Sequence, residues 1–205
     1  MVLLWIASLA YFEPPKTLYM VQEEQRLGKT VKQTWVDIED IAPVMPRSVA
    51  AAEDANFCVH WGIDMNALRE AIEDGGTRGA STISQQVVKN VFLWQGRSYP
   101  RKALEALLTP IVEIMWSKKR IMEVYLNVAE FDEGVFGVAA ASRHYFGVSA
   151  DKLSPTQAAR LAAILPSPKG RSAKNPGAFT RKKAQSVIDG AATLMADGRA
   201  ECFAD

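Results

Sequence analysis

A glycine-rich turn that leads straight into an amphipathic segment, residues 78–90, restricts the fold of this 205-residue chain more than any other stretch. After the turn, apolar side chains recur at the spacing of one helix face: Ile83, Val87, Val88, Val91 and Phe92. Thr82 followed three residues later by Gln85 matches a capping box, so a helix is predicted to begin at Ser81 or Thr82. The stretch therefore predicts a helix with one face in a hydrophobic core.

The polar face of this predicted helix carries amides and a cation. Gln85 and Lys89 are four residues apart, as are Gln86 and Asn90, so each pair stacks along the face opposite the apolar one. A helix N-terminus that follows a glycine turn, with hydroxyls and a lysine nearby, suits an anion. Taken alone, the stretch is better explained as an ordinary amphipathic helix with a solvated polar face, and its surroundings decide between the two interpretations.

Helical signals continue along most of the chain. Helices are predicted from Pro46, after the cap Asp64, over residues 101–115, 118–126 and 138–146, after the capping box of Ser154 and Gln157, and over residues 180–195. Pro110 lies inside one of these runs and is expected to kink or break it. Residues 17–38 alternate only weakly and predict an irregular entry region with short strands. These patterns predict one compact, mainly α-helical domain with a long cleft.

Composition and charge exclude several functional classes. The chain is 48% hydrophobic and 23% charged, which is ordinary for a globular core and argues against wholesale disorder. Its net charge of +1 gives no electrostatic argument for a nucleic-acid partner, and none is expected. Basic residues do cluster, with no acidic residue between Lys169 and Lys183. Such clusters are solvated faces or contacts for anionic lipid head groups and phosphates.

The cysteines and histidines offer little metal chemistry. Cys58 and Cys202 have no metal-ligand spacing, and two histidines cannot form a multi-histidine site. The cysteines could bridge in an oxidising compartment, but we favour two unpaired cysteines. Function is therefore expected to come from carboxylates, amides, hydroxyls and cations.

The first twelve residues contain no charged side chain. The run is too short to cross a bilayer, which takes about 20 apolar residues, and it lacks the basic start and cleavage site of a signal peptide. We interpret residues 1–15 as the outer part of an N-terminal membrane anchor, with Trp5 and Tyr11 suited to the membrane interface. The alternative is a hydrophobic arm packed on the domain.

Two carboxylates flank the central stretch, Glu53 before it and Glu105 after it. Between them lie hydroxyls, amides and the cations Lys89 and Arg97. This arrangement suits transfer of a sugar from a diphosphate leaving group, because one carboxylate can take the proton of an acceptor hydroxyl while fixed cations stabilise the departing diphosphate. Many helical proteins carry two glutamates at such a separation, so the pattern alone does not establish this chemistry.

Five stretches, in order across residues 40–170, give the sequence a resemblance to the peptidoglycan glycosyltransferase family, specifically to its monofunctional biosynthetic members. They are residues 53–57 with His60, Gly62 and Asp64; residues 79–86 with Lys89 and Asn90; residues 101–105; residues 120–127; and residues 136–140 with residues 145–147. One motif would be weak evidence, whereas five in order are specific. Ala80 departs from the pattern, since the family usually has glycine there, and if that position needs φ > 0 alanine costs on the order of 1 kcal/mol.

The resemblance implies a lysozyme-like helical fold with a smaller membrane-proximal lobe, occupying residues 16–205 behind the partial anchor. It implies polymerisation of lipid II into glycan strands, with inversion at the anomeric carbon and release of the polyprenyl diphosphate. Glu53 would be the general base. Glu105 would assist the leaving diphosphate directly or through a divalent cation such as Mg²⁺ or Mn²⁺, although no cofactor is obligatory.

The resemblance also implies a substrate-binding set. Lys89 and Arg97 would hold the diphosphate, while Arg101 and Lys102 would be partly structural and partly electrostatic. The donor site would be lined by hydroxyl and amide side chains: Ser81, Thr82, Gln85, Gln86 and Asn90.

Several motif residues have a structural alternative beside the functional one. Asp54 and Asp64 are expected more as helix caps or hydrogen-bond acceptors than as catalysts. Phe57 and His60 belong to the substrate-binding set, although His60 is as readily explained as a packed histidine with its hydrogen bonds satisfied. Three further residues are expected to brace the cleft from below: Glu123, Tyr125 and Asn127.

The implied partners are lipid II, the growing glycan strand and the bacterial cytoplasmic membrane, with other cell-wall synthesis proteins as further candidates. The implied location is the inner membrane, with a single-pass anchor and the catalytic domain on the periplasmic side. Two other functions compete. A muramidase-like glycan hydrolase would have no use for Lys89 and Arg97, and an inactive membrane-anchored scaffold is favoured only by Ala80.

Overall fold

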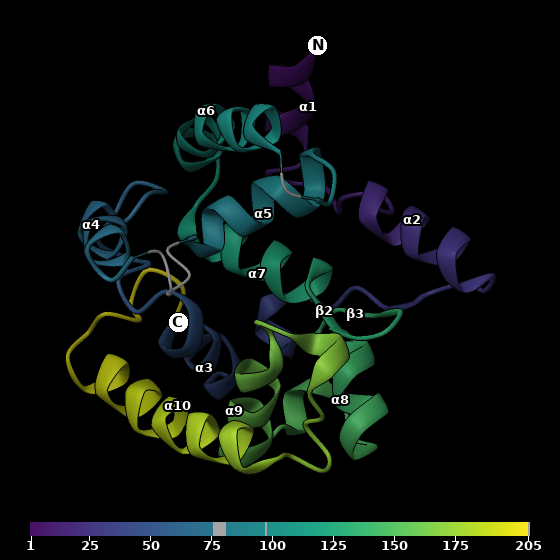
Figure 1. Ribbon diagram of the computed structural model, residues 1–205, viewed down its shortest axis with the longest axis vertical. Coiled ribbons are helices and arrows are strands. Elements are labelled where there is room, and N and C mark those ends of the chain that lie inside the picture. Colours follow the sequence, from purple (N-terminus) through teal and green to yellow (C-terminus); the bar gives the residue numbers. More distant parts are fainter. Residues whose placement is uncertain (76–80, 97, 205) are drawn as a thin grey trace.

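Helices form most of the part of the chain that the computed structural model describes, which is residues 1–75, 81–96 and 98–204 (Figure 1). The α-helices are α1 (Val2–Ser8), α2 (Leu18–Leu27), α3 (Val44–Glu53), α4 (Met65–Glu73), α5 (Ile83–Phe92), α6 (Tyr99–Met115), α7 (Lys118–Val128), α8 (Val138–Phe146), α9 (Pro155–Ile164) and α10 (Ala178–Ala196). Short 3₁₀ helices lie at Ile38–Asp40, Ala150–Lys152 and Pro168–Gly170. The prediction of a mainly α-helical, lysozyme-like domain is confirmed.

The sheet is small and has three short strands: β1 (Lys32–Gln33), β2 (Glu130–Asp132) and β3 (Val135–Phe136). β3 is the central strand, parallel to β1 and antiparallel to β2. The sheet therefore ties the segment before α3 to the hairpin that follows α7.

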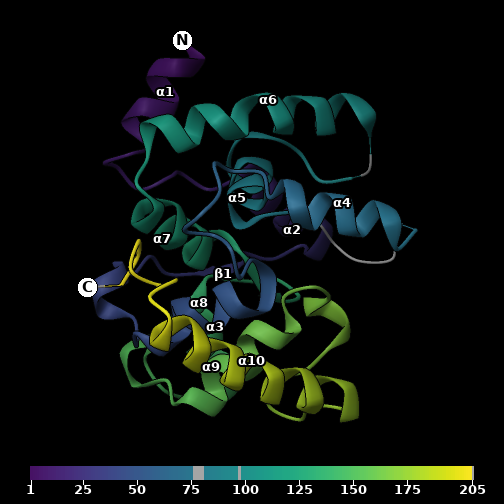
Figure 2. The ribbon, with the colours of Figure 1, turned by 90° about the vertical axis from the view of Figure 1, so that its left-hand side faces the viewer.

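The helices lie in two groups with α5 and α7 between them. α3, α9 and α10 pack on one another at one end of the molecule, and α6 lies with α1 at the other (Figures 1 and 2). α7 is surrounded on nearly all sides, since every residue from Ile121 to Val128 is buried, as expected of a central helix. The predicted apolar stripe of α5 lies in the core, where Ile83, Val87 and Val88 are fully buried.

Local capping signals predicted several helix ends correctly. Thr82 is the N-cap of α5, and its side chain and that of Gln85 form the reciprocal capping box. Ser154 and Gln157 do the same for α9. Asp64 caps α4 by accepting from the backbone amides of Asn66 and Ala67, both at 3.0 Å.

Two predictions of local structure were wrong in part. The expected short strand is present as β1, and a kink at Pro110 stays a prediction. Residues 17–38 are not irregular throughout, because α2 begins behind the N-cap Thr17 and ends at Gly28, whose φ of 64° suits a helix C-terminus. The segment after residue 100 does not break at Pro110, since α6 continues to Met115. Thr109 and Val112, on either side of the proline, are both fully buried, and this packing holds the two halves in one helix.

The N-terminal residues pack on the domain. Ile6 and Leu9 are buried, Trp5 meets the ring of Phe92, and the indole nitrogen of Trp116 donates to the Ile6 carbonyl at 2.8 Å. Among the described residues, none of the helices combines the length and the apolar character needed to cross a bilayer. The anchor interpretation of residues 1–15 stays a prediction.

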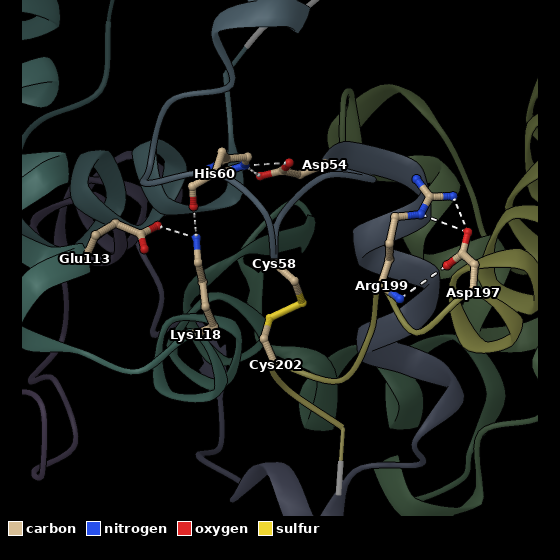
Figure 3. Close-up of a disulfide and its surroundings, with 8 residues drawn as sticks. All are labelled: Asp54, Cys58, His60, Glu113, Lys118, Asp197, Arg199 and Cys202. Atoms are coloured by element: carbon tan, nitrogen blue, oxygen red, sulfur yellow. Dashed lines mark hydrogen bonds and ion pairs between the residues drawn. A yellow bond between two sulfur atoms is a disulfide. The ribbon is translucent and has the colours of Figure 1, made fainter.

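The expectation of unpaired cysteines was wrong. Cys58 and Cys202 form a disulfide across a sequence separation of 144 residues (Figure 3). The segment after α10 returns to the loop that follows α3, and only this long-range packing brings the two sulfur atoms together.

Candidate active site

The cleft consists of two adjoining cavities, of about 440 Å³ and 550 Å³, that share Ser81 and Gln86 in their walls. The first, which we call the Glu105 cavity, is lined by Ser81, Gln85, Gln86, Lys89, Ser98, Tyr99, Arg101, Lys102 and Glu105. The second, the Glu53 cavity, is lined by Ala52, Glu53, Ser81, Gln86, Pro166, Arg171, Phe179 and Lys183. The two predicted carboxylates therefore lie on opposite sides of a wall formed by the start of α5.

Glu53 is the last residue of α3 and is partly buried. The side-chain amide of Gln86 donates to its Oε2 at 3.0 Å, and the Tyr125 hydroxyl donates to Gln86 Oε1 at 3.3 Å. This chain of hydrogen bonds fixes the carboxylate orientation. Its other oxygen, Oε1, accepts no hydrogen bond from the residues that the structure describes and remains available to a ligand.

Burial raises the pKa of the Glu53 carboxyl above its ordinary value. The hydrogen bond from Gln86 and the charges of Lys183 and Lys89 oppose this rise, whereas the neighbouring Asp54 adds to it. A carboxylate with a raised pKa accepts a proton more readily than an exposed one, which suits a general base.

Lys89 supplies a cation with no fixed partner in the described part of the chain, where no hydrogen bond or ion pair engages its ammonium group. Burial lowers the pKa of this ammonium, and the carboxylate of Glu105 offsets part of the decrease. A partly desolvated cation that lines a cavity is favourably placed to bind an anionic group.

Glu105 is buried and is paired with the guanidinium of Arg101 one helical turn earlier. Arg101 also donates from Nε to the Gly96 carbonyl at 2.9 Å, so its position is fixed at two points. With Lys89 and Lys102, these residues give the Glu105 cavity three cations against one carboxylate. The surplus positive charge suits a polyanionic ligand.

The expected role of a divalent cation beside Glu105 stays a prediction. The described residues contain no group of three or more His, Cys, Asp or Glu side chains that could hold a metal ion, and Glu105 is already paired with a guanidinium. Mg²⁺ commonly takes one or two carboxylates from the protein and its other oxygen ligands from waters and substrate phosphates. No chemical step is assigned to a metal here.

Five predicted site residues lie behind the cleft wall rather than on it. Asp54 accepts from the amide of Ile83 at 3.0 Å and from His60 Nε2 at 2.9 Å. The Thr82 hydroxyl donates to the Gly62 carbonyl at 2.5 Å. Phe57 is buried beneath the ammonium of Lys118, and Asn90 accepts from Gln95 at 3.0 Å. These residues support the wall from inside.

Of the three residues expected to brace the cleft from below, Tyr125 bonds a cleft residue, whereas Glu123 and Asn127 hold the segment at Val36 and Ile38. Glu123 accepts from the Ile38 amide at 2.9 Å, and Asn127 bonds both the amide and the carbonyl of Val36. Tyr125 is the buried donor to Gln86 described above. Two positions discussed from the sequence, Arg97 and Ala80, lie outside the described residues.

Several cleft residues were missed from the sequence. Ser98 and Tyr99 line the Glu105 cavity, and Arg171, Phe179 and Lys183 line the Glu53 cavity. The basic run from Lys169 to Lys183 was noticed, but its position beside Glu53 depends on the packing of α10 against α3. The Arg171 guanidinium stacks on Phe179 at 4.8 Å, which helps to fix it at the cavity edge.

The region that contains this cleft matches a known protein family. The family model described as "Transglycosylase" matches residues 20–192, which include every residue that lines the two cavities. The chain belongs to the transglycosylase family. The outermost residues of the chain, among them Cys202, lie outside the matched region of this transglycosylase.

Curated relatives cover most of the transglycosylase chain. The "Biosynthetic peptidoglycan transglycosylase" of Jannaschia sp. (strain CCS1) is 56% identical over 205 residues, covering 100% of this chain and 85% of the relative. The protein of the same name from Caulobacter vibrioides is 46% identical over 198 residues, with coverages of 95% and 86%. That of Rhizobium meliloti is 48% identical over 189 residues, with coverages of 90% and 79%.

Proposed function

We propose that this transglycosylase polymerises lipid II into peptidoglycan glycan strands, by glycosyl transfer with inversion and release of a polyprenyl diphosphate. The observation that carries the proposal is the pair of adjoining cavities, one rich in cations and the other holding a carboxylate with a raised pKa. Such a reaction brings together an anionic leaving group and a hydroxyl nucleophile, and each cavity suits one of them.

In the Glu53 cavity, the carboxylate takes the proton of the acceptor sugar hydroxyl as the hydroxyl oxygen attacks the anomeric carbon of the donor. The bond from that carbon to the diphosphate oxygen breaks, and its electrons leave with the diphosphate. Attack from the side opposite the leaving group inverts the anomeric centre. Gln86 and Tyr125 keep the Glu53 carboxylate oriented for this proton transfer.

In the Glu105 cavity, Lys89, Arg101 and Lys102 stabilise the negative charge that grows on the departing diphosphate. Glu105 holds Arg101 in place, and its charge opposes the fall that burial causes in the pKa of Lys89. Because an activated diphosphate leaves without strong protonation, no general acid is needed opposite Glu53. Ser81 and Gln85 complete the described part of the proposed donor site, and the diphosphate contact expected of Arg97 stays a prediction.

Arg171 and Lys183 extend the proposed site beyond the sequence prediction. Both line the Glu53 cavity, and the charge of Lys183 favours the ionised form of Glu53. We assign them to the acceptor, whose phosphate groups they would hold while its sugar hydroxyl faces Glu53.

The proposed location is outside the cytoplasm, with the α6 end of the molecule at the membrane. α6 and α1 lie together at this end of the molecule (Figure 2). α6 exposes Leu107 and Ile114, and α1 exposes Leu4 and Trp5. An exposed apolar patch of this kind suits contact with lipid. Such contact would place the donor cavity close to the lipid tail of its substrate.

The test is lipid II polymerisation by the purified protein. The wild-type protein is expected to form glycan strands, and Glu53→Gln is expected to form none while keeping its circular dichroism spectrum. Shortening of preformed glycan without synthesis would instead establish a hydrolase, and inactivity on both substrates would establish a scaffold.

A further inference from the structure

The loop at residues 54–64 connects Glu53 to α4 and reaches the C-terminal segment through the Cys58–Cys202 disulfide (Figure 3). We infer that this disulfide is a positioning element for the active site. It holds the loop in place, so that Asp54 fixes the position of the start of α5 relative to Glu53. The inference rests on the proposed function only where it concerns catalytic rate.

Asp54 is the point at which the loop acts on the cleft. It directly follows Glu53, and its Oδ2 accepts from the amide of Ile83, the first residue of α5, at 3.0 Å. This amide has no acceptor within its own helix, as is general for the first turn of an α-helix. Since α5 carries Gln86 and Lys89, the position of Asp54 sets where these side chains lie relative to Glu53.

Asp54 is in turn held by the rest of the loop. His60 Nε2 donates to its carboxylate at 2.9 Å, while Nδ1 of the same ring accepts from the Gly62 amide at 3.1 Å. The Lys118 ammonium donates to the His60 carbonyl at 2.7 Å. A displacement of the loop between Asp54 and Gly62 would therefore disturb the Asp54 carboxylate.

Cys58 lies in the middle of this loop, next to its one fully buried side chain, Phe57. Phe57 packs against Phe203, with ring centroids 6.0 Å apart, and Phe203 follows directly after Cys202. The loop has no helix or strand of its own from Asp54 to Asp64. The disulfide and the adjoining Phe57–Phe203 contact thus fasten the loop at its centre, while hydrogen bonds fasten its ends.

Formation of the Cys58–Cys202 disulfide requires an oxidant, and a second disulfide that is itself reduced can serve as one. A thiolate of one cysteine attacks the oxidant's disulfide and forms a mixed disulfide. The second thiolate then attacks the protein sulfur of that mixed disulfide and displaces the oxidant's thiolate, so that two protein thiols lose two electrons and two protons and the oxidant becomes a dithiol. Both cysteines are only partly buried, so a dithiol reagent can reverse the reaction. Disulfides of this kind persist outside the cytoplasm.

The experiment compares the oxidised wild-type protein, the protein reduced with dithiothreitol and alkylated, and the Cys58→Ser/Cys202→Ser variant. Hydrogen exchange measured by NMR at Ile83 and Gly62 reports the Asp54 and His60 hydrogen bonds without needing activity. Initial polymerisation rates at varied lipid II concentration give kcat and KM separately. Asp197→Asn, which removes an ion pair with Arg199 in the same C-terminal segment but keeps the disulfide, is the matched control.

The reduced protein and the double variant are expected to exchange at Ile83 and Gly62 at least about tenfold faster, with the interior of α9 unchanged. Their kcat is expected to fall severalfold with KM unchanged, and reoxidation of reduced, unalkylated protein is expected to restore it. Unchanged exchange at Ile83, or an equal acceleration at all amides, would overturn the positioning role. If the oxidised protein does not polymerise lipid II while Ile83 still responds, the proposed function fails and the positioning role stands.

Discussion

The side-chain amide of Gln86 lies 3.0 Å from Oε2 of Glu53 and joins the first turns of α5 to the last residue of α3. Gln86 lines both cavities of the cleft. Its side-chain oxygen, Oε1, accepts from the buried hydroxyl of Tyr125. The orientation of the proposed base is therefore set by an α5 residue that also faces the donor.

Replacement of this amide provides a direct test. Gln86→Ala is expected to lower kcat about tenfold, because it removes one oriented hydrogen bond worth about 1–1.5 kcal/mol. Since the Gln86 hydrogen bond opposes the rise in the pKa of Glu53, the acidic limb of the rate profile is expected to move to higher pH. The measurement is the initial polymerisation rate across pH. Gln185→Ala on α10 is the control, and an identical shift there would contradict the role of Gln86.

The raised pKa of Glu53 also predicts how stability depends on pH. A group whose pKa is higher in the folded state than in the unfolded state stabilises the fold at pH values below its unfolded-state pKa, which is about 4.3 for glutamate. This stabilisation is lost as the pH rises through the folded-state pKa. Glu53→Gln is therefore expected to unfold at a higher temperature than the wild-type protein at pH 7, with the difference vanishing below about pH 4. Thermal unfolding at several pH values measures this. Glu70→Gln, on the exposed side of α4, should show no such dependence.

Replacement of Lys89 is expected to stabilise the fold and to lower activity. Lys89→Met keeps the length of the side chain but removes a partly buried charge, so the variant should unfold at a higher temperature at neutral pH. Loss of a cation aimed at the diphosphate should lower kcat/KM for lipid II by about 100-fold. Lys182→Met, on the exposed face of α10, is the control for both measurements. An unchanged kcat/KM would remove Lys89 from the donor site.

The packing of α1 can be tested without reference to activity. Trp116→Phe removes the indole donor to the Ile6 carbonyl, at an expected cost of about 1 kcal/mol, and should free the N-terminal segment. Limited proteolysis is expected to cut residues 1–15 faster in this variant. Trp94→Phe keeps that hydrogen bond and should be cut at the wild-type rate. Equal rates in the two variants would show that the Trp116 hydrogen bond does not hold the segment.

Features governed by local sequence could be predicted. The start of α5 followed from Thr82 and Gln85, and the bounds of α8 followed from an Ala-rich run that begins after Gly137. Helix α2 is not predicted by its apolar pattern, which is weak, although Thr17 and Gly28 carry the signals of its two ends.

Features governed by long-range packing could not be predicted in the same way. Nothing near Cys58 indicates Cys202, and nothing near Lys183 indicates Glu53. Both relationships arise when α10 packs on α3 and the following segment turns back. Some motif residues lie on the cleft surface and others support it from behind. Glu53 belongs to the first set and Asp54 to the second, and this division depends on how α3 ends.

The disulfide also sets an order of events in biogenesis. Its two cysteines are 144 residues apart, so the bond cannot close until the ribosome has made residue 202 and export has delivered it to the oxidising side. The loop beside Glu53 is thus secured after every cleft residue has already been delivered. A polypeptide whose synthesis or export stops short of Cys202 would contain all the proposed catalytic groups but would lack the covalent bond that holds them in register.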